Sequence, residues 1–381
     1  MNIYETMNSY DVPAGACVSS QEAWRSFHVY YSDLDLILRD CICPFLLGAR
    51  DGLTNAFCER HYSGGSHVRV RFLGEEREAS KVANEFRKVA ARFVAERPSA
   101  RSQSYSAERA REMMEADGQD PSACELQYQV NVVTEAPYER LTSRTLPPGL
   151  TGLLESFLGD CLPVMASILG SSRPKAEEAL RIYFVQAAVS TGDMRIGSVA
   201  FRAHWEGFAG LQRNRKLVAG IRENYARQRQ YIRTLLRDVH ERCSGTQLDD
   251  DPVTGGWSKL IRTHDRRVTA RLRGGDNLGF PSPDADVVRE NIAKVKGQTL
   301  EHSAFLDTLF GDTNFFVSFG RDPMLLRIRV LTNLLYCLIA NLGLSMIDRM
   351  SLCYFAHRAV EDYFNCDLTE QLRGTMKSFT A

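Results

Sequence analysis

The sequence predicts an α+β fold, in which an N-terminal antiparallel sheet with helices is followed by a helical C-terminal half. Three observations support this class. Between residues 22 and 135, aromatic and β-branched residues gather in short runs that alternate apolar and polar side chains, as half-buried strands do. From Pro147 onward, the apolar residues recur every three or four positions, which is the period of a helix. Hydrophobic residues make up 44% of the 381 residues and charged residues 25%, the balance of a globular protein.

Local signals predict the N-terminal elements one after another. Residues 24–31 (WRSFHVYY) are aromatic and β-prone, which predicts a first strand. Asp33 precedes apolar residues at helical spacing, so we expect it to cap a helix that stops between Pro44 and Gly48. Two alternating runs flank the turn Ser-Gly-Gly-Ser at 63–66, which predicts a β-hairpin over 55–73. After it we predict a helix over 75–96, a short helix over 107–116 and a strand over 125–133.

The second half is predicted to be almost entirely helical. Helices are expected over about 149–169 and 174–190, with a short strand over 197–201 and long helices as far as about 243. Loops at 249–256 and 274–286 flank a basic amphipathic helix, and the most apolar helices are predicted at 325–342 and 346–364. Neither loop is long enough to require two domains. We therefore predict a flexible extension over 1–21, one domain over 22–366 and a C-terminal tail over 367–381.

Composition excludes several classes of protein. The 47 basic and 47 acidic side chains balance, whereas nucleic-acid binders carry a basic surplus. The ten cysteines have neither the spacing of a metal site nor the density of a secreted disulfide framework. No signal peptide is recognisable and no apolar run is judged long enough to cross a bilayer, so a cytoplasmic protein is expected.

Well-known catalytic and nucleotide-binding motifs are missing from the sequence. It contains no GxGxxG, no GxxxxGK[ST], no HExxH and no GxSxG. The basic run over 213–242 could contact nucleic acid or a tRNA, but an exposed charged helix face has the same composition. We therefore expect no metal, nucleotide or redox cofactor.

The first candidate site is one face of the second hairpin strand. His67, Arg69 and Arg71 point to the opposite side from Val68, Val70 and Phe72. Two guanidiniums about 7 Å apart can hold a carboxylate or a developing oxyanion. Arg60, on the partner strand, is expected to add a third charge. A solvent-facing strand whose arginines pair with surface acids would give the same pattern.

The second and third candidate sites lie in the helical half. His204, with Arg202 and Glu206 beside it, is expected at a strand-to-helix junction, where a neighbouring carboxylate can tune a general acid or base. A core or capping histidine is the alternative. Asn333 and Tyr336 lie one turn apart in an apolar helix, where buried polar groups form either a site or a helix–helix hydrogen bond.

These residues resemble a known family. Residues 24–31, the apolar helix to Pro44, Arg60-His61-Tyr62 and the run SHVRVRF at 66–72 are similar to the opening of the lanthipeptide dehydratase C-terminal domain, also called the thiopeptide-type bacteriocin biosynthesis domain. Tyr138-Glu139-Arg140 resembles the family's E-x-E-R-Y element, and residues 197–206 resemble its S-H-A-E segment. The resemblance covers about 22–365.

The resemblance implies an enzyme of RiPP biosynthesis, the production of ribosomally synthesised and post-translationally modified peptides. Members of the family either eliminate glutamate from glutamylated Ser or Thr or, as pyridine synthases, join two dehydroalanines in a formal [4+2] aza-cycloaddition with loss of water and the leader peptide. This chain is expected to be a stand-alone copy. Elimination members usually carry H-M-x-x-N-R in the penultimate helix, and the matching stretch at 332–336 has neither the His nor the Arg.

The missing histidine favours the pyridine synthase and leaves elimination, or a non-catalytic peptide-binding partner, as alternatives. We expect Arg69, Arg71, His204 and Tyr336 to be catalytic, and a further group to bind substrate: Arg60, His67, Arg202, Glu206 and Asn333. The expected partners are the leader and core of a precursor peptide and other pathway enzymes. A homodimer is compatible with the sequence, whereas nucleic acid and membrane are not expected partners.

Overall fold

The computed structural model describes residues 22–62, 65–100, 129–140, 146–211, 214–244, 250–280, 303–311 and 321–380, with a few isolated residues between them. Its backbone divides into two compact units. The unit with the sheet, here called the N-terminal unit, comprises residues 11–175 and 337–346. The C-terminal unit comprises 1–10, 176–336 and 347–381. The single domain over 22–366 stays a prediction, and the extension over 1–21 and the helix over 107–116 lie outside the described residues, apart from Arg111.

The predicted antiparallel sheet is confirmed, and its four strands lie in the order β2-β3-β1-β4. Every neighbouring pair is antiparallel. The predicted hairpin is β2 and β3. The predicted strand over 125–133 overlaps β4 only at residues 132 and 133, because 129–131 are not in a strand and 125–128 lie outside the described residues. The strands are β1 (Glu22–Tyr30), β2 (Asn55–His61), β3 (His67–Glu75) and β4 (Val132–Glu135).

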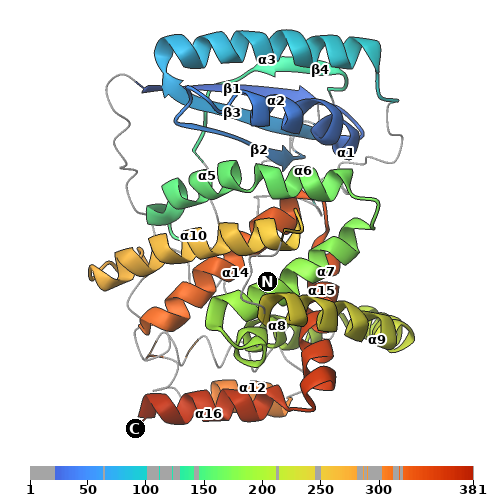
Figure 1. Cartoon of the computed structure of the whole chain (residues 1–381), viewed down its shortest axis with the longest axis vertical. Helices are drawn as coiled ribbons and strands as arrows, with labels where there is room; N and C mark the ends of the chain where they lie inside the picture. The colour runs from blue at the N-terminus through green and yellow to red at the C-terminus, as the bar shows by residue number, and fades with distance from the viewer. Residues whose placement is uncertain are drawn as a thin grey trace. The chain divides into compact units, whose positions relative to one another are not determined.

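One face of the sheet is apolar and is covered by helices (Figure 1). Helix α3 (Glu76–Glu96) buries an alanine-rich stripe with Phe86 at its centre. The Phe86 ring lies 5.6 Å from the ring of Phe27 on β1 and 5.4 Å from that of Phe72 on β3. Small alanines let the helix approach the strands closely, while the phenylalanines fill the space between them.

A helical segment follows β1, as the sequence predicts. Asp33 accepts a hydrogen bond from the backbone N–H of Leu36, which caps α1 (Leu34–Ile37). The chain continues through the π-helix η2 (Leu38–Ile42) into α2 (Cys43–Gly48), whose first turn contains a proline. The edge strand β2 packs on α5 (Thr151–Asp160), which is followed by α6 (Leu162–Gly170) and preceded by the 3-10 turn η4 (Pro148–Leu150).

Helices make up most of the described residues of the C-terminal unit. Helices α8, α12 and α16 pack on one another around an apolar cluster formed by Phe305, Leu306, Leu309, Phe310 and Leu372 (Figure 1). Part of the predicted C-terminal tail is therefore a packed helix. The helices are α7 (Lys175–Thr191), α8 (Met194–Ala209), α9 (Arg215–Ser244), α10 (Thr254–Arg273), α12 (Ala304–Phe310), α14 (Pro323–Asn341), α15 (Met346–Phe364) and α16 (Leu368–Thr380).

The predicted strand over 197–201 is wrong, because these residues lie inside α8. Its buried positions follow a helical period: Met194, Gly197, Ser198, Phe201, Trp205 and Phe208. Gly197 allows α8 to approach α7 closely, since an added Cβ would lie 2.1 Å from the carbonyl oxygen of Ala187. The glycine and the β-branched residues near it reflect helix packing and not strand propensity.

Two further details differ from the sequence analysis. Asp251, expected in a solvated loop, accepts hydrogen bonds from the backbone N–H of Thr254 and from Arg181, and so anchors the start of α10.

Helix α14 is long and apolar enough to cross a membrane, and so is the bent pair α5–α6 if it counts as one span. More than half of the apolar window of α14 is buried, as in the core helix of a soluble protein.

Candidate functional site

The register of the sheet decides which side chains share a face with the two arginines. Directly paired residues of antiparallel strands project to the same side. Arg69 pairs with His28 of β1 and Glu59 of β2, and Arg71 pairs with Ser26 and Phe57. The face opposite the apolar one is thus polar and basic, and we call it the arginine face: Ser26, His28, Tyr30, Glu59, His61, His67, Arg69 and Arg71.

Arg71 is held inside the protein. Its side chain is 1% exposed, and it donates a hydrogen bond to the hydroxyl of Ser26. Its guanidinium carbon lies 5.3 Å from the centre of the Tyr138 ring, a cation–π geometry. The arginine pair therefore does not lie flat on the surface, as a solvent-facing strand would require.

Glu59 lies against both guanidiniums. Its Oε1 lies 3.6 Å from Nη2 of Arg71 and 4.0 Å from Nη1 of Arg69. Burial raises the pKa of Glu59, while Arg71 and Arg69 lower it. Glu139 also acts electrostatically on Arg71, so two carboxylates oppose the two guanidiniums. Among the described residues, Nε of Arg69 and Nε of Arg71 are buried without a hydrogen-bond partner, so this face still offers two N–H donors to an anion or a carbonyl oxygen. Nε2 of His67 is an acceptor, because Nδ1 lies 2.8 Å from the backbone oxygen of Gly65 and carries the hydrogen.

Three histidine rings stand beside the arginines. The ring of His67 lies 4.8 Å from that of His28 and 5.0 Å from that of His61. Burial, aided by Arg69 and Arg71, lowers the pKa of His28 to about 4, of His67 to about 3 and of His61 to about 2. At neutral pH the rings are uncharged, so the positive charge of this face comes from the arginines.

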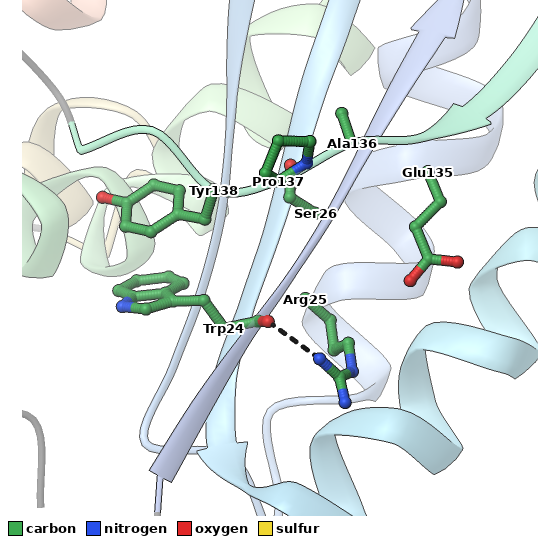
Figure 2. Close-up of a pocket in the computed structure, with 7 residues that line it drawn as sticks. All are labelled: Trp24, Arg25, Ser26, Glu135, Ala136, Pro137 and Tyr138. Atoms are coloured by element: carbon green, nitrogen blue, oxygen red, sulfur yellow. Dashed lines mark hydrogen bonds between the residues drawn. The ribbon is translucent and has the colours of Figure 1, made fainter.

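An open depression of about 290 Å³ adjoins the arginine face where β1 pairs with the chain after β4. Figure 2 shows Trp24 and Tyr138 on one side of β1 and Arg25 and Glu135 on the other. The Trp24 and Tyr138 rings lie 4.1 Å apart. Ser26, the hydrogen-bond partner of Arg71, lines this depression.

The prediction that Arg60 adds a third charge to this face is wrong. Arg60 pairs with Val68, so its side chain projects to the opposite face. There its Nε donates to the backbone oxygen of Asn341 at 2.7 Å, and its guanidinium pairs with Asp35. The side chain is 7% exposed, and its role in the described structure is to tie β2 to residues 337–346 of the same unit.

A second group of predicted residues meets in the C-terminal unit. His204 lies inside α8 and not at a strand end. Its ring is perpendicular to that of Tyr336 on α14, with centres 5.1 Å apart. Nδ1 lies 2.8 Å from the backbone oxygen of Ala200, which can only accept, so Nδ1 carries the hydrogen and Nε2 is left as an acceptor. Burial lowers the pKa of His204 to about 4.

Tyr336 is buried among residues that the sequence analysis did not select. Its hydroxyl lies 3.3 Å from Sγ of Cys353, and the Arg349 guanidinium carbon lies 5.0 Å from its ring centre. The ring of Tyr183 on α7 is 6.4 Å away. Burial raises the pKa of Tyr336 well above its usual value, so the phenol stays protonated at neutral pH.

The other predicted substrate-binding residues of this unit have structural contacts. Arg202 forms ion pairs with Glu206 at 3.4 Å and with Asp367 at 2.9 Å, and a third with Glu361. Asn333 is 7% exposed on α14. Arg202 and Glu206 therefore stabilise α8 against its neighbours, and their predicted contact with substrate stays a prediction.

Within the described ranges, no group of three or more His, Cys, Asp or Glu residues is arranged to hold a metal ion.

The sequence profile for the lantibiotic biosynthesis dehydratase C-terminal region matches residues 24–360. The chain belongs to this family. It is thus a member of a family of RiPP-modifying proteins, as the resemblance implied.

Two solved structures share the fold of this chain, and a third is less similar. A pyridine synthase, TbtD, from thiomuracin biosynthesis is 21% identical, with 90% of this chain and 99% of that one covered and a TM-score of 0.65. TsrL is 17% identical, with 93% and 98% covered and a TM-score of 0.62. The tRNA-dependent lantibiotic dehydratase MibB from Microbispora sp. 107891 is 17% identical, with 92% of this chain and 29% of that one covered and a TM-score of 0.45. Curated protein sequences contain no match to the chain.

Proposed function

We propose that this family member is an enzyme that joins two dehydroalanines of a ribosomal precursor peptide in a formal [4+2] aza-cycloaddition, followed by loss of water and the leader peptide. The observation that carries the proposal is the pair formed by the part-buried His204 and the buried Tyr336, whose ring centres are 5.1 Å apart. Helix α14, described along its whole length, contains no histidine, whereas glutamate elimination in this family is expected to use one there.

The pair supplies one proton acceptor and one proton donor. His204 is neutral with Nε2 as its acceptor, and Tyr336 keeps its proton. Converting a backbone amide to its iminol form removes a proton from nitrogen and places one on oxygen, so an acceptor and a donor side by side suit that step. The same phenol can donate to the oxygen that leaves as water.

Holding the two alkenes in place supplies the rest of the rate enhancement in this proposal. A reaction between two parts of one peptide gains several kcal/mol when the reacting atoms are held in contact. In the proposal, Arg69 and Arg71 hold a carboxylate or a polarised amide of the peptide. Their support is the burial of Arg71 and the buried Nε atoms of both arginines, which have no partners in the described chain.

Glutamate elimination is the second candidate, and the same arginine face favours it. A buried guanidinium pair could hold the carboxylates of a glutamyl ester while a base removes the Cα proton and glutamate leaves. The three neutral histidines of this face could accept that proton.

Mass spectrometry distinguishes the candidates. We expect the purified chain to convert a thiazolyl peptide with two dehydroalanines into a pyridine macrocycle and a released leader. Loss of a glutamyl mass from a glutamylated peptide would instead support elimination. Tight leader binding without turnover of either peptide would leave only the non-catalytic partner.

Variants then assign the roles of the residues. Tyr336→Phe removes the donor without changing the shape of the ring, and we expect kcat to fall by roughly 100-fold. Arg71→Lys keeps the charge but loses the planar fork, and we expect KM to rise more than kcat falls. Unchanged kinetics in both variants would disprove this assignment of roles.

The wider setting of the reaction is also a proposal. A leader peptide would bind a separate groove by strand addition or helix docking, in the cytoplasm and beside other pathway enzymes. Fluorescence polarisation with a labelled leader measures that binding, and light scattering of the purified chain tests the homodimer. A leader that does not bind would remove the precursor peptide as a partner.

A further inference from the structure

Arg349, at the start of α15, lies beside the His204–Tyr336 pair. Its guanidinium carbon is 5.0 Å from the centre of the Tyr336 ring, and its positive charge acts on His204, Tyr183 and Cys353. Its Nε is buried and donates no hydrogen bond to any residue that the structure describes. The proposed function gives this arginine no role.

Three other arginines with little exposed surface face carboxylates. Arg71 lies against Glu59, Arg181 pairs with Glu178 and Asp251, and Arg202 is surrounded by three acids. Arg349 is part-buried, and among the described residues its buried Nε has no acceptor. A donor shielded from water is unfavourable unless another group supplies an acceptor. The contrast indicates a position that a ligand completes.

Tyr183 contributes a second donor at the same place. Its ring lies 6.4 Å from that of Tyr336, and its buried hydroxyl interacts with the Cys353 thiol, which is a weak hydrogen-bond acceptor. Burial raises the pKa of Tyr183 well above its usual value, so the hydroxyl keeps its hydrogen. Two donors without a strong acceptor in the described structure, one cationic and one neutral, therefore flank the Tyr336 ring.

We propose that Arg349 and Tyr183 form an oxyanion-binding site for a backbone carbonyl oxygen of the peptide substrate on which negative charge develops. The proposal rests on the proposed function, because it places that oxygen beside His204 and Tyr336. Besides Arg349, the groups that contact the Tyr336 ring or hydroxyl are aromatic rings, a neutral imidazole and a thiol, while the charge of Arg329 also acts on His204. Surroundings made mainly of uncharged groups suit a single oxygen better than a phosphate dianion, which needs several cations or backbone donors.

Kinetics of variants provide the first test. Removing one oxyanion donor costs roughly 100-fold to 1000-fold in kcat in other enzymes, so we expect about 100-fold for Arg349→Gln with KM within about 3-fold of the original. Arg349→Lys should recover part of this loss, and Tyr183→Phe should lower kcat by about 10-fold. The matched control is Arg373→Gln, which removes an exposed ion pair with Glu370 and should leave kcat unchanged.

A direct reading of Arg349 in the wild-type protein avoids dependence on variants that fold poorly. With selectively ¹⁵N-labelled arginine, the Nε–H resonance of Arg349 is assigned by its loss in Arg349→Lys. We expect it to shift when the dehydroalanine peptide binds. A peptide that binds without moving this resonance overturns the oxyanion site.

The two proposals fail in different ways. If the wild-type chain forms the pyridine product and Arg349→Gln does so equally well, the site is disproved while the proposed function stands. If the wild-type chain converts neither peptide but the Arg349 resonance moves on binding, the proposed reaction is wrong and the binding site stands. A wild-type chain that neither binds nor converts the peptide disproves both.

Discussion

Replacing Gly197 with alanine tests the packing that positions His204. Gly197 lies in α8, seven residues before His204, and faces the backbone of α7. An alanine Cβ there would lie 2.1 Å from the carbonyl oxygen of Ala187 and 2.7 Å from two of its backbone carbons. Because these atoms belong to the backbone, no side-chain rotation can relieve the contact.

The size of the effect follows from this geometry. Real Cβ atoms essentially never lie closer than 3.0 Å to another atom, whereas this one would lie 2.1 Å from the Ala187 oxygen. The two helices must therefore separate by about 0.9 Å, which is 3.0 Å minus 2.1 Å. Overpacking a core costs about 1–3 kcal/mol, and a backbone contact belongs at the upper end. Alanine regains about 1 kcal/mol over glycine in helix propensity, which leaves a net loss of about 2 kcal/mol.

Gly220→Ala is the matched control. Gly220 is an exposed residue inside α9, and an added Cβ would meet no atom within 4 Å. The same substitution should therefore stabilise the protein by about 1 kcal/mol. Urea unfolding of the two variants should show free energies that differ by about 3 kcal/mol.

Activity provides a second measurement on the same variants. A displacement of about 1 Å in a catalytic group can cost roughly 100-fold in rate, so folded Gly197→Ala should turn over far more slowly than Gly220→Ala. If Gly197→Ala is as stable and as active as Gly220→Ala, α7 and α8 do not pack as described and the placement of His204 is wrong.

Two other predictions concern pH and the misassigned arginine. Lowering the pH from 7 to 5 should destabilise the fold, because burial keeps His67 and His357 neutral with pKa values of about 3, while their unfolded pKa is near 6.5. The free energy of unfolding is then lost as the pH falls below about 6.5, by about 2 kcal/mol per histidine at pH 5. Urea unfolding at pH 7 and pH 5 should show a smaller loss of this free energy for His357→Gln than for the wild type. Arg60→Met should lower the free energy of unfolding by about 1–2 kcal/mol, because the backbone oxygen of Asn341 loses a donor while the half-exposed Asp35 keeps Lys175, yet the folded variant should keep its kcat. A lower kcat at unchanged stability would instead return Arg60 to the site.

The elements that follow from local patterns were predictable. The hairpin alternates strictly across a glycine-rich turn, and the structure forms β2 and β3 there. Asp33 precedes apolar residues at helical spacing, and it caps α1 as expected. In each case the signal lies within a few residues, so the local preference and the tertiary structure agree.

The error at 197–201 came from competing local signals. β-branched and aromatic residues near Gly197 suggested a strand, although positions 194, 197, 198, 201 and 205 already had a helical period. The error at Arg60 was avoidable too. Counting cross-strand pairs from the turn places Arg60 opposite Val68, on the apolar face.

The sequence by itself determined the α+β class, the hairpin and the burial pattern that puts Arg69 and Arg71 on one side of β3. It could not determine that Glu59 stands against both guanidiniums, because this depends on the register of β2 and β3. Nor could it bring Tyr183 of α7 to Tyr336 of α14, because these two helices lie far apart in the chain. Their proximity results from long-range packing, for which no local pattern of residues carries a signal.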